Sequence, residues 1–155
     1  KVQRDNRNSA YNERYNQLRK AERILNVDNL GRVKIDQLDK DLFNDNSIYR
    51  RALHVVTENK RTINAKNLMI NNEMNQFGNL MNLSHLSYSR DFEASTPDVD
   101  LLVQRSIEYG ALGCRLTGGG FGGFTVSLIE KKYYDNWYNK MCSFYAEEKF
   151  LKICT

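Results

Sequence analysis

The sequence of 155 residues has little of several features that mark common classes of protein. No apolar run approaches the roughly 18 residues that a membrane-spanning helix needs. The first residues, KVQRDNRN, lack the apolar core of a signal peptide, so we expect a cytoplasmic protein with no membrane partner. The three cysteines, Cys114, Cys142 and Cys154, are odd in number and show no C-x-x-C spacing. We therefore expect free thiols, with neither a disulfide framework nor a bound metal.

An excess of charge of one sign is also missing. Lys and Arg total 23 against 19 Asp and Glu, which gives a net charge of only +4. The basic residues are interleaved with acidic ones, as in RKAER, whereas a nucleic-acid surface gathers them in one patch. We expect no nucleic-acid partner. Hydrophobic residues make up 41% of the chain, which suits one buried core, and the length suits a single domain over residues 1–155.

Helical periodicity is present through most of the sequence. Apolar residues recur at steps of three and four, which places them on one face of a helix. This pattern predicts helices over residues 9–25, 34–43, 47–70, 72–88, 97–109 and 131–149. The residues expected to face inward include Ile35, Leu38, Leu42, Met81, Leu86, Tyr134, Trp137 and Met141. Other residues on the helical period are Tyr11, Tyr15, Ile48, Ala52, Ile63, Val99 and Leu102. Pro97, the only proline, is expected to begin its helix, with Ser95 or Thr96 as the N-cap.

The periodicity changes after Gly110. In ALGCRLT, residues 111–117, apolar and polar residues alternate, and FTVSLIE, residues 124–130, is rich in residues that favour strands. The ending FLKICT, residues 150–155, predicts a closing strand. The fold class that follows is α+β: an antiparallel sheet with helices packed on one face, plus additional helices from the N-terminal half.

Five of the nine glycines lie between the two central strands, at Gly118, Gly119, Gly120, Gly122 and Gly123. They satisfy G-x-G-x-x-G, but a strand follows them instead of a helix, which excludes the dinucleotide-binding fingerprint. A plain hairpin turn needs one or two glycines, so it is the less favoured alternative. So many glycines allow positive φ angles and let a ligand or another segment approach the backbone, while exposed amides suit an anion.

The segment GALGCRLTGGGFGGFTVSLIE, residues 110–130, resembles the third conserved motif of galactokinases, which belong to the GHMP small-molecule kinase superfamily. Three other segments resemble motifs of that family in the same order: SAYNERY (9–15), RRALHVVTENKRT (50–62) and LMNLSHLSYSRDFEASTPDVDLLV (80–103). Departures from the family pattern occur at Asp98, Cys114 and Phe124.

The resemblance implies the ferredoxin-like C-terminal lobe of a kinase that transfers the γ-phosphoryl group of ATP to the anomeric hydroxyl of galactose, with Mg²⁺. The family's galactose motif, phosphate loop and catalytic aspartate do not occur in these 155 residues. The resemblance therefore implies no catalytic residue in this chain, an inactive isolated lobe, and an N-terminal lobe as the partner that binds most of the ATP and Mg²⁺. It also implies that Tyr11 binds the sugar and that the five glycines lie near the substrates.

Alternatives remain open for several of these residues and for the function. Tyr11 can be a plain helix-face aromatic, and a strand arginine such as Arg115 is expected to pair with a carboxylate more often than with phosphate. His54 and His85 are expected to be hydrogen-bonded structural residues. Asp100 is assigned no catalytic role. The alternative functions are a catalytically inactive sugar sensor or partner-binding module, and a kinase for a related sugar such as N-acetylgalactosamine or arabinose.

Overall fold

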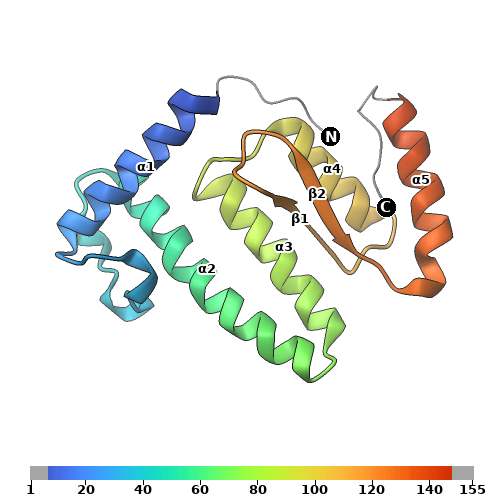
Figure 1. Ribbon diagram of the computed structural model, residues 1–155, viewed down its shortest axis with the longest axis horizontal. Helices are drawn as coiled ribbons and strands as arrows, with labels where there is room; N and C mark the ends of the chain where they lie inside the picture. The colour runs from blue at the N-terminus through green and yellow to red at the C-terminus, as the bar shows by residue number, and fades with distance from the viewer. Residues whose placement is uncertain (1–6, 148–155) are drawn as a thin grey trace.

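The computed structural model describes the backbone of residues 7–147 and the side chains of residues 10–146 (Figure 1). The α-helices are α1 (Arg7–Ile24), α2 (Asn46–Ile70), α3 (Met74–Arg90), α4 (Pro97–Glu108) and α5 (Tyr134–Glu147), and the strands are β1 (Gly113–Thr117) and β2 (Phe124–Leu128). The connections contain 3-10 helices at Leu30–Arg32, Ile35–Gln37, Lys40–Leu42 and Lys131–Tyr133. This arrangement confirms the predicted α+β fold. Within residues 7–147, no helix is both long and apolar enough to cross a membrane.

Two clusters of buried apolar side chains lie on opposite sides of α3. The first joins α1, the connection after it and α2, and consists of Ala21, Leu30, Val33, Leu38, Phe43, Ile48, Ala52 and Val56. The second joins α4, β1 and α5, and consists of Val99, Leu102, Ala111, Leu116, Trp137, Met141 and Phe144. Helix α3 packs against α2 on one side and against β1 on the other, as Figure 1 shows. It therefore links the helical half to the half that contains the sheet.

The two strands form an antiparallel pair in which Cys114 lies opposite Ser127 and Leu116 opposite Thr125. Cys114 and Leu116 are buried, and this face of the sheet packs against α4. A hydrogen bond of 2.8 Å between the hydroxyls of Ser106 and Ser127 joins helix and sheet there. In β1 the predicted period-two alternation thus places Cys114 and Leu116 inside, whereas in β2 the apolar residues Phe124 and Val126 are exposed.

Helix α3 runs along the outer edge of β1, where a further strand would otherwise pair. The Oδ1 atom of Asn82 accepts a hydrogen bond of 2.9 Å from the Cys114 N–H. The Nδ1 atom of His85 accepts one of 3.3 Å from the Leu116 N–H. Because an unpaired buried N–H is costly, these two side chains replace the backbone partners that a neighbouring strand would supply.

Helix α3 and strand β1 approach closely where Gly78 meets Gly113. A Cβ atom at Gly113 would overlap the backbone of Gly78, and one at Gly78 would lie 2.5 Å from the carbonyl oxygen of Leu112. Neither position has room for a side chain, because the neighbouring atoms belong to backbone that cannot move aside.

The connection over residues 34–43 differs from the single helix predicted for it. It forms two short 3-10 helices separated by Leu38 and Asp39. Asp39 accounts for the break, because its carboxylate accepts a hydrogen bond from the backbone N–H two residues later and so starts a new turn. Leu38 is buried as predicted, but Ile35 and Leu42 are 47% and 53% exposed. The prediction that both face inward was wrong.

Other predictions for individual residues had mixed outcomes. Leu86 and Tyr134 are exposed, although they were predicted to face inward, and Tyr11, Tyr15 and Ile63 on the same helical period are exposed as well. The period is correct in each helix, but among residues 7–147 too little packs over these positions to bury them. Thr96 is the N-cap of α4, with its hydroxyl 3.3 Å from the Val99 N–H, and Pro97 begins the helix. The strand predicted for residues 150–155 and the thiol of Cys154 lie outside the described residues.

Candidate functional site

The turn between α3 and α4, residues 91–95, brings three helices together. Arg14 of α1 donates from Nε to the Phe92 carbonyl at 2.7 Å and from Nη2 to the Glu93 carbonyl at 3.2 Å. Glu93 has a positive φ of 50°, and its carboxylate accepts a hydrogen bond of 2.6 Å from Arg51 of α2. Charged side chains of α1 and α2 thus hold the turn in place, although it contains no regular secondary structure.

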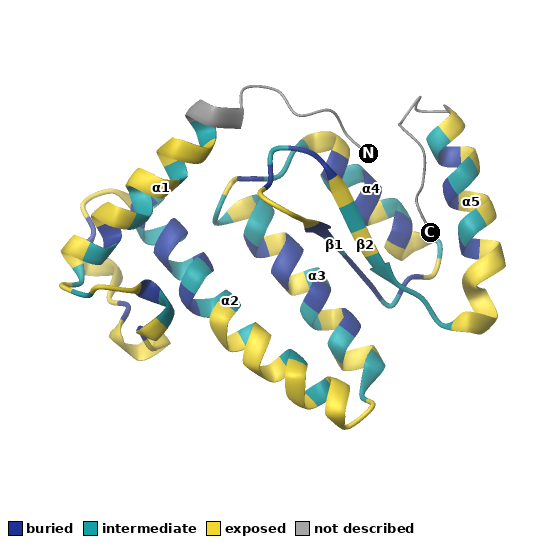
Figure 2. Cartoon of the chain, viewed as in Figure 1, coloured by how far each residue is buried: buried dark blue, intermediate teal, exposed yellow. Residues whose placement is uncertain are grey.

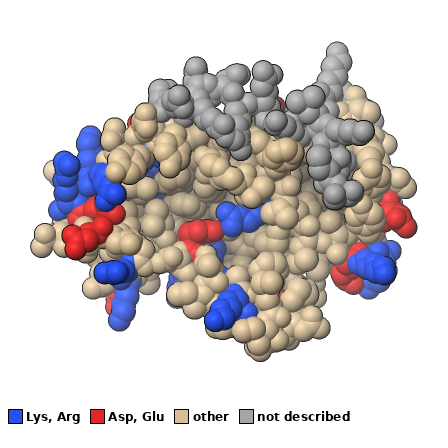
Figure 3. Space-filling view, viewed as in Figure 1, with Lys and Arg blue, Asp and Glu red and all other residues tan. Residues whose placement is uncertain are grey.

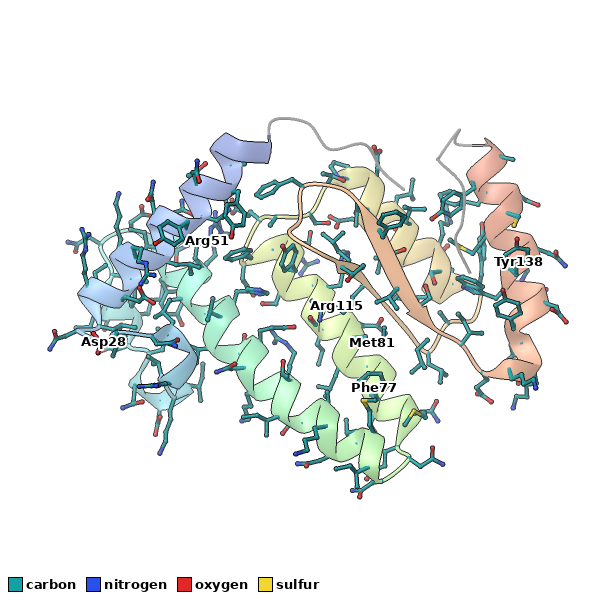
Figure 4. All side chains as sticks on the ribbon, in the orientation of Figure 1. Asp28, Arg51, Phe77, Met81, Arg115 and Tyr138 are labelled. Carbon is teal, nitrogen blue, oxygen red and sulfur yellow. The ribbon has the colours of Figure 1, made fainter. Side chains whose placement is uncertain are left out.

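Arg51 is fully buried at the centre of this junction, and Figure 4 labels it between α1 and α2. Its guanidinium also donates to Gln17 Oε1 at 3.0 Å and to the Asp91 carbonyl at 2.5 Å. The hydrogen bond from Arg51 is the main reason that the pKa of Glu93 is lowered, and Arg50 adds to it. Burial of a guanidinium is costly unless it has such partners. The hydrogen bonds of Arg51 therefore fix the positions of α1, α2 and the turn relative to one another.

The glycine loop between β1 and β2 adopts a backbone that few other residues can adopt. The residues with φ between 56° and 113° are Gly118, Gly120, Phe121, Gly122 and Gly123. The first part of the loop, Gly118 and Gly119, is exposed, whereas the three later glycines are buried (Figure 2). Glycine is favoured in this region of φ because it has no Cβ, so the composition of the loop follows from its conformation.

The turn at residues 91–95 is also what approaches the glycine loop. The Phe121 N–H donates to the Ala94 carbonyl at 2.7 Å. A Cβ atom at Gly120 would lie 2.6 Å from that same carbonyl oxygen and 2.7 Å from the hydroxyl of Tyr88. At Gly120, then, the close neighbour is the chain's own backbone. By contrast, no atom lies within 4 Å of the position that a Cβ on Gly119 would occupy.

Tyr11 lies near the start of α1. Its side chain is 57% exposed on the first part of α1. Burial is the main reason that the pKa of the Tyr88 phenol is raised; Arg115 lowers it and Tyr11 raises it. The Tyr88 hydroxyl lies against Gly120. The role of Tyr11 stays a prediction.

Arg115 pairs with a carboxylate, as favoured from the sequence. Its Nη1 lies 3.3 Å from Glu58 Oε1, and Arg61 Nε lies 2.7 Å from the other oxygen. Ser84 donates to the same carboxylate at 2.5 Å. Burial raises the pKa of Glu58, but the hydrogen bonds from Ser84 and Arg61 outweigh it and leave the pKa lowered. Figure 3 shows an acidic and a basic group side by side in the middle of this face.

This charged cluster borders a groove between α2, α3 and the sheet. The groove has a volume of about 360 Å³, and its walls include Phe77 and Met81, which Figure 4 labels with Arg115. Its lining residues include neither Tyr11 nor a glycine of the loop. The groove is therefore separate from the candidate site.

Both histidines are largely buried and hydrogen-bonded. His54 Nδ1 lies 3.0 Å from the Ser87 hydroxyl, and its ring stacks on Phe92 with centroids 4.8 Å apart. Burial lowers the pKa of His54 to about 4 and also lowers that of His85. Each is therefore a neutral imidazole near neutral pH, as expected of a structural residue.

Sequence reasoning did not identify Tyr88, Arg51 or Glu93 as parts of this site. All three lie within motifs noted for their family resemblance, but nothing in the sequence shows that they meet. One indication was available for Arg51, which falls three residues after Ile48 on the buried face of α2. A charged residue at an apolar period predicts a buried ion pair.

Comparisons with known proteins identify the family to which the fold belongs. The family described as "GHMP kinases C terminal" matches residues 65–147. The galactokinase of Clostridium acetobutylicum is 37% identical over 147 residues, which cover 90% of this chain and 38% of that protein. The galactokinase of Levilactobacillus brevis is 37% identical over 138 residues, which cover 84% of this chain and 36% of that protein. A crystal structure of Lactococcus lactis galactokinase complexed with galactose superposes with a TM-score of 0.87 at 30% identity, and the match covers 95% of this chain and 40% of that one.

The fold is an α+β domain in which a glycine loop between two antiparallel strands is held against a charged turn. The chain belongs to the GHMP kinase C-terminal family. It spans less than two fifths of the length of the two curated galactokinases named above, and the match lies in their C-terminal part.

Proposed function

We propose that this chain is the C-terminal lobe of a galactokinase, an enzyme that transfers the γ-phosphoryl group of ATP to the anomeric hydroxyl of galactose. The observation that carries the proposal is the superposition on Lactococcus lactis galactokinase over 95% of this chain with 30% identical residues. On this proposal the protein acts in the cytoplasm, where ATP and sugar are available.

The chain's contribution is proposed to be positioning. Phosphoryl transfer depends mainly on alignment and charge stabilisation, so a lobe with no catalytic side chain still affects the rate. Tyr11 offers an exposed phenol that can bond a sugar hydroxyl and cover one face of the ring. The open part of the glycine loop, Gly118 and Gly119, lets a substrate approach the backbone, while the buried part anchors it.

The proposal assigns no Mg²⁺ ligand to this chain. Among residues 7–147, no group of three or more His, Cys, Asp or Glu side chains is arranged to hold a metal ion. The proposal places Mg²⁺ and most of the ATP contacts in an N-terminal lobe, and it expects the isolated chain to be inactive.

The test is an assay of the complete gene product. The reading frame that encodes Lys1–Thr155 is extended upstream, the full protein is purified, and sugar phosphate is measured with ATP and galactose. The proposal expects an upstream phosphate loop and aspartate, and turnover with galactose as the preferred acceptor. Parallel reactions contain N-acetylgalactosamine and arabinose, and the 155-residue chain alone is the control.

Each other outcome points to a different function. A folded full-length protein that binds galactose without phosphorylating any sugar is the sensor that the sequence left open. Faster turnover with N-acetylgalactosamine or arabinose keeps the kinase and changes its acceptor. Turnover by the 155-residue chain alone would contradict the proposed division of labour between two lobes.

A further inference from the structure

Asp100 makes more hydrogen bonds than a surface residue on the first turns of α4 needs. Its Oδ1 accepts a hydrogen bond of 2.5 Å from the Ser95 hydroxyl, and its Oδ2 accepts one of 2.7 Å from the Ser89 hydroxyl. Hydrogen bonds to an ionised carboxylate are short and about twice as strong as neutral ones. They join the end of α3 to the start of α4 across the turn at residues 91–95.

The same carboxylate also meets His85. The Nε2 atom of His85 lies 3.1 Å from Asp100 Oδ1, although the N–H does not point straight at the oxygen, so the pair is a charge–dipole contact. His85 accepts the Leu116 N–H through Nδ1, which requires the tautomer with its proton on Nε2. A carboxylate beside Nε2 favours that tautomer. Asp100 therefore keeps His85 able to hold β1.

The contacts of Asp100 with His85 and with Ser95 each lead to the glycine loop. Leu116, held through His85, lies two residues before Gly118, where the loop begins. Ser95 directly follows Ala94, whose carbonyl accepts the Phe121 N–H in the middle of the loop. One carboxylate thus acts on the loop at its entrance and at its centre.

We propose that Asp100 is a positioning residue that fixes the glycine loop from two sides, through His85 and through Ser95. The loop depends on such support because five of its residues have positive φ, including Phe121 at 56°. A backbone of this kind persists only where its surroundings determine it. The effect on catalysis rests on the proposed function, whereas the effect on the loop does not.

The chain offers a matched control in Asp98. This carboxylate is exposed, lies in the same first turn of α4, and makes no hydrogen bond or ion pair that involves residues 7–147. Asp98→Ala removes the same charge near the same helix end, so any general effect on α4 appears in both variants. Only Asp100→Ala removes the contacts to Ser89, Ser95 and His85.

The experiment is amide hydrogen exchange, followed by NMR, on the 155-residue chain. In Asp100→Ala the amides of Leu116 and Phe121 should exchange about five- to tenfold faster than in Asp98→Ala, which corresponds to the loss of one ordinary hydrogen bond. The Cys114 amide should not change, because Asn82 holds it independently of Asp100. Asp100→Asn keeps an oxygen acceptor and should restore most of the protection.

Equal acceleration of Leu116, Phe121 and Cys114 would show that Asp100 only stabilises the domain, and unchanged exchange at all three would show that it does not act on the loop. Either result overturns the proposal. In the full-length protein, Asp100→Ala should lower kcat/KM for galactose about tenfold relative to Asp98→Ala, with Asp100→Asn in between. If that protein phosphorylates no sugar, the proposed function fails while the exchange result still decides the role of Asp100.

Discussion

The contrast between Gly119 and Gly120 gives a test of why the loop is rich in glycine. The two residues are neighbours, but their surroundings differ. At Gly120 the φ angle is +85°, and a Cβ would lie 2.6 Å from the Ala94 carbonyl oxygen. At Gly119 the φ angle is outside that region, and nothing lies within 4 Å of the Cβ position. Alanine at one position therefore meets two obstacles, and alanine at the other meets none.

The expected cost follows from those two obstacles. The left-handed backbone costs an alanine about 1–2 kcal/mol. The overlap with a backbone carbonyl, which cannot rotate away as a side chain can, adds about 1–3 kcal/mol. Gly120→Ala should therefore lower the free energy of unfolding by about 2–5 kcal/mol. Gly119→Ala should change it by less than about 1 kcal/mol, because a compatible Gly to Ala change mainly reduces the entropy of the unfolded chain.

The assay is thermal and urea unfolding of the two variants and the parent chain, followed by circular dichroism. For a domain of this size, the cost at Gly120 corresponds to a fall in Tm of roughly 5–15 °C. If Gly120→Ala and Gly119→Ala unfold alike, the loop's glycines are not required by the turn at residues 91–95. That result would refute the claim that the close Ala94 carbonyl requires glycine at position 120, and it would favour a plain flexible hairpin.

Three further predictions concern the supports of the site. The folded state keeps His54 neutral with a pKa of about 4, whereas the unfolded chain protonates it near 6.5, so the free energy of unfolding should fall by about 3 kcal/mol between pH 6.5 and pH 4. In urea titrations across that range His54→Asn should lose the His54 part of this slope and keep the parts from His85 and from the lowered pKa values of Glu58 and Glu93, and an unchanged slope would contradict the assignment. Arg51→Met removes the donor to Gln17 Oε1 and to the Asp91 carbonyl and one of the two arginines that hydrogen-bond the Glu93 carboxylate, and should cost about 1.5–3 kcal/mol. Arg19→Met removes only an exposed ion pair and should leave the urea midpoint close to that of the parent. Equal urea midpoints for the two variants would show that the buried network contributes nothing. Gly78→Ala places a Cβ 2.5 Å from the Leu112 carbonyl and should cost about 1–3 kcal/mol despite the better helix propensity of alanine, and a variant that is more stable than the parent in thermal unfolding would refute the close helix–strand contact.

Much of the fold could be predicted because periodicity and local residue preferences carry it. The long apolar period of residues 47–70 gave α2, and Pro97 preceded by Thr96 gave the start of α4. The change to period two after Gly110 gave the two strands. Each of these depends on residues that are close together in the chain, which is the information that a pattern contains.

The predictions of burial that failed depend on which other segments pack over a residue. The helical period of the sequence contains no information about those segments. Ile63 continues the apolar face of α2 but is 64% exposed, because the helix extends past α1 (Figure 1). The same holds for the candidate site. Its glycines could be predicted, but their neighbours Ala94 and Tyr88 could not, since they lie more than twenty residues away in the sequence.

The most direct test of the central claim is a comparison of two tyrosines in the full-length protein. Tyr11 and Tyr15 both lie on α1 and are 57% and 50% exposed, but only Tyr11 is assigned to the sugar. Tyr11→Phe should raise the KM for galactose about three- to tenfold, the value of one hydrogen bond, and leave the KM for ATP unchanged. Tyr15→Phe should change neither. A KM for galactose that stays the same in Tyr11→Phe, or that rises equally in both variants, would contradict the account.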